Sequence, residues 1–393
     1  MLSKRLETLT PSYTLEISSK IRQLKDLNLE VIDLSIGEPN FNVPIRAKLY
    51  GIESLNNNYT RYDAVTGIKP LKEEICKKLL KENNCTYCPE DIVVSSGAKH
   101  CLTNTLLALT NPNDEVLIPI PYWVSYPEIV KIVNAIPVFI HTSKDNSFKI
   151  KAEDLSRCIS KNTKALILNN PNNPTGSIYT KNELEEIVEI CYKNNIYILA
   201  DEIYEKICYK DNFTSIASIS NLAKDITITI NGFSKSTNMT GLRLGYTASN
   251  SSIAKAISSI QGHSVSHPCI TSQYIAYGAL RECNSDINQF VNEYKLRRKL
   301  ICAKLDSINN ISYIKPYGAF YVFIDISKLK NTLNYNGSFS LEFCSKFLDT
   351  YNVAVVPGIA FGLDDYIRIS FACDESVFLE GVDRLDKFIN SFS

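Results

Sequence analysis

The 393-residue sequence lacks net charge, because 42 basic residues balance 42 acidic ones and no basic block stands out. A protein whose main partner is nucleic acid or an anionic membrane needs a basic surface, so this balance argues against both classes. No stretch approaches the roughly 20 apolar residues of a membrane span, and the first ten residues carry charges where a signal peptide needs an apolar core. The sequence predicts a soluble, cytoplasmic protein that acts on small molecules.

The sequence also lacks internal repeats, low-complexity linkers and a regular cysteine framework. Its twelve cysteines are scattered, which favours reduced thiols in a reducing compartment. Cys85 and Cys88 form one isolated Cys-x-x-Cys pair, and a metal site would need a second pair of ligands. We therefore predict no metal site.

What the sequence does have is an alternation of short apolar runs with amphipathic helical patterns between about residues 91 and 249. The predicted strands are Ile92–Val94, Glu115–Ile118, Pro137–His141, Ala165–Leu168, Ile196–Ala200, Ile226–Ile230 and Gly245–Ala248, and the predicted helices include Lys99–Leu109 and Lys181–Asn194. This alternation predicts an α/β fold with a mostly parallel sheet covered by helices.

After about residue 284 the pattern changes to that of a smaller α+β domain. It consists of a long charged helix through Lys299, a strand at Gly318–Asp325, a helix near Phe339–Thr350, a strand at Tyr366–Ser370 and a helix at Glu375–Asn390. We expect an N-terminal arm at 1–13, a small domain formed by 14–47 and 285–393, and a large domain at 48–284.

Two charged residues follow apolar strands of the predicted sheet. Asp201 and Lys235 both come just after the carboxyl end of such a strand, which is where open α/β sheets bind ligands. Ser234 precedes the lysine and Arg243 follows it. A lysine amine suits an aldehyde, an aspartate suits a pyridine nitrogen, and a hydroxyl with a guanidinium suits a phosphate. The cofactor that these residues suggest is pyridoxal 5′-phosphate.

A second phosphate-binding segment is predicted at Ser96-Gly97-Ala98. These residues follow a strand and open a helix, so free backbone N–H groups and the positive end of the helix dipole would face an anion. An ordinary strand-to-helix turn is the alternative when this segment is taken alone.

With these motifs the chain resembles the class I aminotransferases, which are fold type I pyridoxal-phosphate enzymes, and within them the bacterial aspartate aminotransferases of subgroup Ib. The resemblance covers essentially the whole chain and is carried by Pro11-Ser-Tyr-Thr14, Ser35-Ile-Gly-Glu-Pro39, Tyr62 before Gly67, Ser96-Gly-Ala-Lys99, Pro121-Tyr-Trp123, Asn170-Pro-Asn-Asn-Pro-Thr-Gly176, Asp201-Glu-Ile-Tyr204, Ser234-Lys235, Arg243-Leu-Gly-Tyr246, Pro316-Tyr-Gly-Ala-Phe320 and Arg368. It implies a seven-stranded sheet in the large domain and a smaller α+β domain.

The resemblance also implies roles around the cofactor. Lys235 would form the Schiff base and Asp201 would face the ring nitrogen, while Tyr204 and Asn173 would hydrogen-bond the phenolic oxygen. Trp123, the only tryptophan, would stack on the ring; its alternative is an aromatic anchor in the core. Tyr62 would reach the phosphate of a partner subunit, which implies a homodimer with shared active sites.

For the substrate, the resemblance implies two carboxylate sites. Arg368 and the backbone of Gly37 would bind the α-carboxylate, and strand alternation places Arg368 away from the apolar side, where an ordinary surface arginine is the alternative. Lys99 and Thr14 would recognise a distal carboxylate.

The implied reaction converts L-aspartate and 2-oxoglutarate to oxaloacetate and L-glutamate in a ping-pong sequence. Three alternatives stay open on the sequence: an aminotransferase for aromatic amino acids, alanine or prephenate; a pyridoxal-phosphate lyase on the same scaffold; and a non-catalytic regulator. The regulator would need an additional N-terminal DNA-binding segment, for which the sequence gives no sign.

Overall fold

The computed structural model describes residues 3–10, 13–209, 213–333 and 335–391. Its largest element is a seven-stranded sheet in the order β2 (Ile92–Ser95), β8 (Gly245–Ala248), β7 (Thr227–Gly232), β6 (Tyr197–Asp201), β5 (Thr163–Asn169), β3 (Glu115–Ile120) and β4 (Ile136–His141). Only β8 runs antiparallel to its neighbours within this sheet. The predicted mostly parallel, seven-stranded sheet is confirmed, with strand ends shifted by one or two residues.

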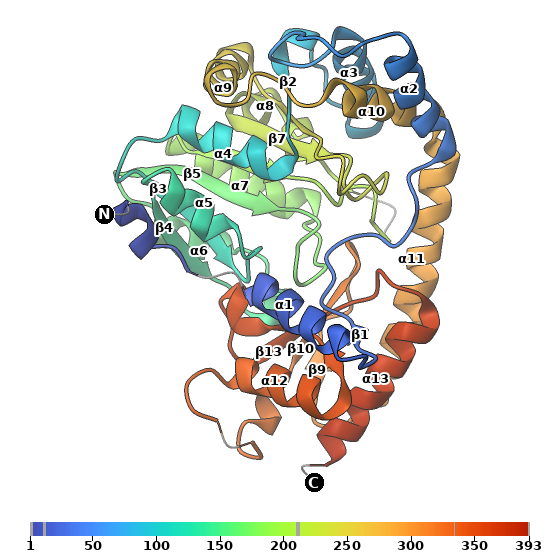
Figure 1. Ribbon diagram of the computed structural model, residues 1–393. Helices are drawn as coiled ribbons and strands as arrows, with labels where there is room; N and C mark the ends of the chain where they lie inside the picture. Colours follow the sequence, from blue (N-terminus) through green and yellow to red (C-terminus); the bar gives the residue numbers. More distant parts are fainter. Residues whose placement is uncertain (1–2, 11–12, 210–212, 334, 392–393) are drawn as a thin grey trace.

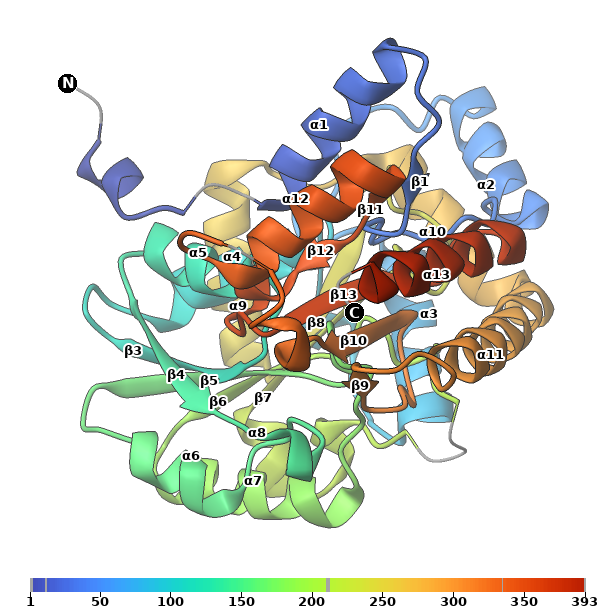
Figure 2. The same cartoon turned by 90° about the horizontal axis from the view of Figure 1, so that it is seen from below.

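Helices cover both faces of this sheet, so its strands are apolar on both sides. The helices of the large domain are α2 (Ile45–Asn56), α3 (Lys69–Asn83), α4 (Ala98–Leu109), α5 (Tyr126–Ile132), α6 (Ala152–Cys158), α7 (Lys181–Lys193), α8 (Asn221–Ile226), α9 (Ser251–Ser264) and α10 (Ile270–Glu282). In β5, Ala165 and Ile167 pack with α4, α5 and α9, while Leu166 and Leu168 pack with α6, α7 and α8. Figure 1 shows α4 and α5 in front of the strands, and Figure 2 separates the two layers, with α6, α7 and α8 on one side of the sheet and α4, α5 and α9 on the other.

Helix α7 illustrates why these sequences become helices. Leu184, Ile187, Val188 and Cys191 repeat at helical spacing and are buried against the sheet. Thr180 caps the first turn in a capping box with Glu183, which satisfies backbone N–H groups that have no partner inside the helix. The predicted helix at 181–194 is confirmed to within one residue.

The small domain contains two short sheets. A four-stranded sheet has the order β12 (Val356–Pro357), β13 (Tyr366–Ser370), β10 (Tyr321–Asp325) and β9 (Ser312–Tyr313), and β1 (Ile32–Asp33) pairs in parallel with β11 (Val353–Ala354). Its helices are α1 (Tyr13–Asp26), α11 (Asn284–Leu305), α12 (Phe339–Tyr351) and α13 (Glu375–Asn390). Short 3-10 helices complete the chain: η1 (Lys4–Glu7), η2 (Pro89–Asp91), η3 (Lys144–Asn146), η4 (Ile216–Ser218), η5 (Ser327–Leu329) and η6 (Gly358–Phe361).

Segments far apart in sequence meet in the small domain. Figures 1 and 2 both place α1, near the amino end, beside α12 near the carboxyl end, and Ile21 of α1 packs with Leu348 of α12. Helix α11 runs along one side of the molecule past both domains (Figure 1). The predicted boundary at 284/285 falls at the start of α11, and the one at 47/48 falls inside α2. In the part of the chain that the structure describes, no helix has the length and apolarity needed to cross a bilayer.

Candidate active site

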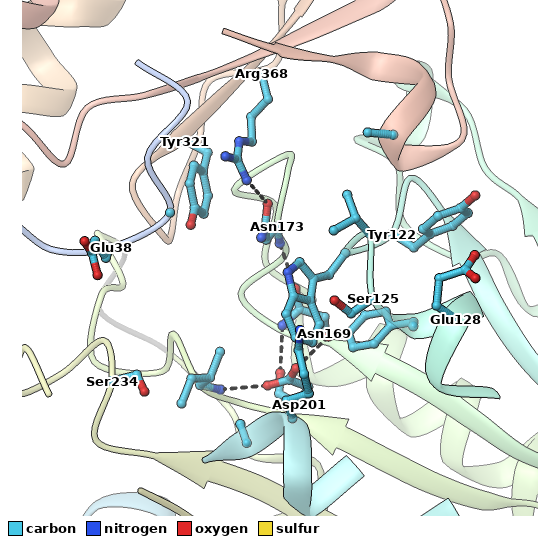
Figure 3. A pocket seen from close by; sticks show the side chains of 18 of the residues that line it. Glu38, Tyr122, Ser125, Glu128, Asn169, Asn173, Asp201, Ser234, Tyr321 and Arg368 are labelled. Carbon is cyan, nitrogen blue, oxygen red and sulfur yellow. Dashed lines mark hydrogen bonds between the residues drawn. The ribbon is translucent and has the colours of Figure 1, made fainter. Parts of the chain in front are cut away.

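A cavity of about 1150 Å³ opens where the carboxyl ends of β5, β6 and β7 face the small-domain strands β10 and β13. This is the edge at which open α/β sheets bind ligands. The structure brings most of the predicted site residues together as lining of this cavity: Gly37, Ala98, Lys99, Trp123, Asn173, Asp201, Tyr204, Ser234, Lys235, Arg243 and Arg368. Figure 3 shows how Asp201 and Ser234 from the large domain face Arg368 and Tyr321 from the small one.

Lys235 lies in the loop after β7, and its ammonium is held inside the cavity. Nζ donates a hydrogen bond to the carbonyl oxygen of Gly37 and lies 6.0 Å from the ring centre of Tyr204. The pKa of Lys235 is lowered to about 8, chiefly by burial; Arg368 and Arg243 act in the same direction, and Glu38 and Asp201 act against it. At pH 7 roughly a tenth of this amine is therefore neutral, far more than for an ordinary lysine, and the neutral amine is the form that attacks a carbonyl.

Asp201 is the last residue of β6 and is 3% exposed. Alternation along the strand places it on the same face as Leu199, which is the face covered by α4 and α5. Its Oδ2 accepts a hydrogen bond from the hydroxyl of Tyr126 at 2.6 Å, and Oδ1 accepts one from the backbone N–H of Ile203 at 3.2 Å. Burial raises the pKa of Asp201 to about 6, while these two bonds and Lys235 act in the opposite direction.

Tyr204 and Asn173 link the sheet edge to the small domain. The hydroxyl of Tyr204 lies 2.9 Å from that of Tyr321, and burial raises the pKa of Tyr204 well above its usual range. Asn173 is fixed by its backbone N–H, which donates to Asn169 Oδ1 at 2.7 Å, and its own Oδ1 faces Arg368.

The turn between β2 and α4 forms a cradle for an anion. Gly97 has a φ of +89°, and a Cβ there would come within 2.8 Å of Arg243 Nη2, so only glycine leaves the guanidinium this close to the turn. Helix α4 begins at Ala98, and while the N–H groups of His100 and Cys101 donate to the Gly97 carbonyl, those of Ala98 and Lys99 come too early in the helix to have a carbonyl partner within it. Ser234 lines the same cavity. These donors fit a phosphate group.

Lys99 lies one residue further into α4, with Nζ 5.0 Å from the ring centre of Trp123. Burial and the nearby Arg243 lower the pKa of Lys99. The side chain lines the cavity from the first turn of α4, where the helix dipole also disfavours a positive charge. An anion in the cavity would offset both costs.

Arg368 is a buried arginine with unused hydrogen-bonding capacity. Its side chain is 4% exposed, so the alternative of an ordinary surface arginine is wrong. Arg368 does point away from the small-domain core, but on that side of β13 it lines the cavity and is not exposed to solvent. Nη2 donates to the carbonyl oxygen of Ser35 at 2.7 Å and Nη1 to Asn173 Oδ1 at 3.2 Å, whereas Nε has no partner within the described part of the chain. Among the described residues no carboxylate pairs with this guanidinium, which is the fork that a substrate carboxylate would fill.

Four predicted residues lie elsewhere or cannot be placed. Ser96 and Gly97 flank the cavity at the turn before Ala98 without lining it. Tyr62 is 91% exposed, away from the cavity, and its ring packs edge-on against His267. Thr14 falls at the start of α1, but its side chain lies outside the described part of the chain.

The structure also adds residues that the sequence did not single out. Tyr126, Asn169, Glu38 and Tyr321 all line the cavity. Asn169 ends β5, so the rule about carboxyl ends of strands would have found it. Tyr126 comes three residues after Trp123, at the start of α5, and its sequence context is that of an apolar core residue. Its ring does pack in the core between α4 and α5.

This combination of a parallel α/β sheet, a buried lysine–aspartate pair and an anion cradle defines a family. The chain belongs to the class I and II aminotransferases, whose family model matches residues 30–385. The protein is therefore an aminotransferase.

Individual relatives match along their full length. The chain is 42% identical over 391 residues to an aspartate aminotransferase of Bacillus sp. strain YM-2, covering 99% of both chains. It is 40% identical over 389 residues to the "Probable aspartate/prephenate aminotransferase" of Aquifex aeolicus, covering 98% of both. The crystal structure of the aspartate aminotransferase from Rhizobium meliloti superposes with a TM-score of 0.95 at 32% identity, covering 99% of each chain.

Proposed function

We propose that this aminotransferase uses pyridoxal 5′-phosphate to convert L-aspartate and 2-oxoglutarate to oxaloacetate and L-glutamate in a ping-pong sequence. The observation that carries the proposal is the pairing, in one cavity, of a lysine whose pKa is lowered to about 8 with the buried carboxylate of Asp201. Relatives named aspartate aminotransferase, 38 to 42% identical over their full length, support the choice of substrates.

The cofactor fits the residues present. The first turn of α4 with Ser96, Gly97 and Ala98 would bind its phosphate together with Ser234 and Arg243, and Trp123 would lie against its ring. Tyr204 and Asn173 would donate to its phenolic oxygen. When bound, pyridoxal phosphate supplies an aldehyde carbon that takes the amino group and a ring that draws electrons from it.

Lys235 would have two tasks. Its Nζ would hold the cofactor through the aldehyde carbon, and its neutral amine would be the base that takes the proton from the substrate Cα. The lowered pKa serves both tasks, because each requires the unprotonated nitrogen. Asp201 would keep a negative charge next to the ring nitrogen.

Two cations at separate points of the cavity favour a dicarboxylate. Arg368, with its unpartnered Nε, and the backbone of Gly37 would bind the α-carboxylate, while Lys99 and Thr14 would bind the distal one. An aspartate aminotransferase from Thermus thermophilus, 31% identical to this chain with a TM-score of 0.92, has been solved with maleate, which is a dicarboxylate. This precedent supports a dicarboxylate site in the present chain.

We further propose a cytoplasmic homodimer with shared active sites. Ile45, Leu49, Ile52 and Leu55 lie along one face of α2 and are all exposed, whereas the opposite face packs on α10. A second copy of the chain would cover these residues and the exposed Tyr62, and would bring Tyr62 to the phosphate of its partner.

A screen of half-reactions tests the function. The holoenzyme is mixed with single amino acids, and the absorbance change from the aldehyde to the amine form of the cofactor is followed. We expect the fastest conversion with aspartate and glutamate, and slower conversion with alanine, phenylalanine and arogenate, the amino acid formed from prephenate. Steady release of ammonia and pyruvate without an acceptor would instead indicate a lyase, and Lys235→Ala is the inactive control.

A further inference from the structure

One buried hydroxyl contacts the proposed machinery without an assigned task. Tyr126 begins α5, is 3% exposed, and packs its ring edge-on against Trp123 at 5.3 Å between ring centres. Its hydroxyl donates to Asp201 Oδ2 at 2.6 Å, the short distance typical of an O–H group bound to a carboxylate. Among the described residues it is the only side chain that donates to this carboxylate.

The charges around Asp201 show why this bond matters. Tyr126 faces it from α5, Lys235 from the loop after β7, Tyr204 from the segment after β6 and Cys101 from α4. Lys235 is the only cation among them. If Lys235 is neutral, its attraction is lost, and the hydrogen bonds to the carboxylate are then the groups of the protein that favour its ionised form.

A carboxylate next to a protonated ring nitrogen competes with that nitrogen for one proton. Burial favours the neutral carboxylic acid, which would take the proton and leave the ring neutral. A hydrogen bond donated to the carboxylate acts the other way, because it stabilises the anion. The ring withdraws electrons best in its protonated form.

We propose that Tyr126 is a positioning residue that holds the Asp201 carboxylate ionised and in a fixed orientation, so that the shared proton stays on the ring nitrogen of the cofactor. The effect of Tyr126 on catalysis follows only if the proposed function is correct. The effect of Tyr126 on Asp201 belongs to the protein alone and can be measured without cofactor.

The first experiment uses the cofactor-free protein. The ionisation of Asp201 is followed by infrared difference spectroscopy or by NMR of ¹³C-aspartate-labelled protein, with Asp201→Asn identifying the signal. In Tyr126→Phe we expect the pKa of Asp201 to rise by about one to two pH units. Tyr179→Phe is the matched control. Tyr179 is also buried, its hydroxyl accepts a hydrogen bond from the Ile150 N–H, and it lies on the opposite face of the sheet from Asp201. An Asp201 pKa unchanged in Tyr126→Phe would overturn the proposal.

The second experiment uses ¹⁵N-labelled pyridoxal phosphate, whose ring-nitrogen chemical shift reports protonation. In Tyr126→Phe we expect the chemical shift to move toward the unprotonated value and kcat to fall 10- to 100-fold at nearly unchanged KM, and we expect Tyr179→Phe to behave like the wild type.

If Tyr126→Phe does not fold, a fluorotyrosine at position 126 keeps the ring and makes its hydroxyl a stronger hydrogen-bond donor, so the pKa of Asp201 should fall. A pKa that stays constant or rises in the fluorotyrosine protein contradicts the proposal. Failure of the wild-type protein to bind the cofactor would refute the proposed function but not the effect on Asp201.

Discussion

Arg368 Nη1 donates a hydrogen bond to Asn173 Oδ1 at 3.2 Å, and this bond connects the small-domain sheet to the turn after β5 of the large domain. Nη2 also donates a hydrogen bond to the carbonyl oxygen of Ser35, whereas Nε has no partner among the described residues. The guanidinium is therefore held in a fixed orientation and can still donate further hydrogen bonds. A ligand that fills the remaining positions would therefore contact residues of both domains at once.

We predict that Arg368→Lys raises KM for every amino acid and lowers kcat/KM by about two orders of magnitude, or about 2.7 kcal/mol, because an ammonium cannot bind a carboxylate through two parallel bonds. Steady-state kinetics with aspartate and with alanine measure the effect, and equilibrium dialysis with pyridoxal phosphate is expected to show unchanged cofactor affinity. A loss confined to aspartate would assign Arg368 to the distal carboxylate instead.

Lys99→Ala should behave differently. We expect kcat/KM for aspartate and 2-oxoglutarate to fall by one to three orders of magnitude, about 1.4–4 kcal/mol, while alanine and aromatic substrates change little, since only dicarboxylates would use this cation. The two variants serve as each other's controls. Equal losses for all amino donors would show that Lys99 serves the cofactor or the fold.

The lowered pKa of Lys235 gives a prediction about pH. The neutral amine is the reactive form, so the rate at which the cofactor-free protein forms its covalent adduct with pyridoxal phosphate should rise with pH and level off above about 8. Stopped-flow absorbance measures the rate, and borohydride trapping with mass spectrometry locates the adduct. Because Glu38 raises the pKa of Lys235, Glu38→Gln should move the midpoint to lower pH. A rate that still increases tenfold per unit between pH 9 and 10 would mean that the pKa of Lys235 is not lowered.

The exposed face of α2 predicts the effect of a charge at the proposed dimer interface. Leu49→Glu should produce monomers in sedimentation velocity and reduce activity, because burying the carboxylate is costly and Tyr62 could no longer reach a partner. Leu222→Glu, a similar change at an exposed leucine of α8, should leave the dimer intact.

Mixed dimers test the sharing of sites directly. Tyr62→Phe and Lys235→Ala chains, each impaired alone, should recover activity when mixed, because each hybrid would contain one site without either change. A fully active wild-type monomer would contradict both dimer predictions.

Periodicity in the sequence was sufficient to predict the sheet, because strands buried on both faces are continuous apolar runs. The same reasoning located Asp201, which directly follows such a run, and Lys235, which lies in the loop just beyond one. It did not predict the burial of Arg368, because alternation tells on which face of a strand a side chain lies but not whether another part of the protein covers that face. It also missed Tyr126: the acceptor of its hydroxyl is 75 residues away, and a tyrosine near an apolar helix looks like core until that contact is known.

Trp123 is the only tryptophan in the 393 residues, and it lines the cavity beside Lys99 and Tyr126. All tryptophan fluorescence of the protein therefore originates from one ring inside the candidate site. Binding of a cofactor or a substrate, or a change in the charge of Lys99, would alter the environment of that single emitter, so the native chain can report occupancy of its own cavity without any attached label.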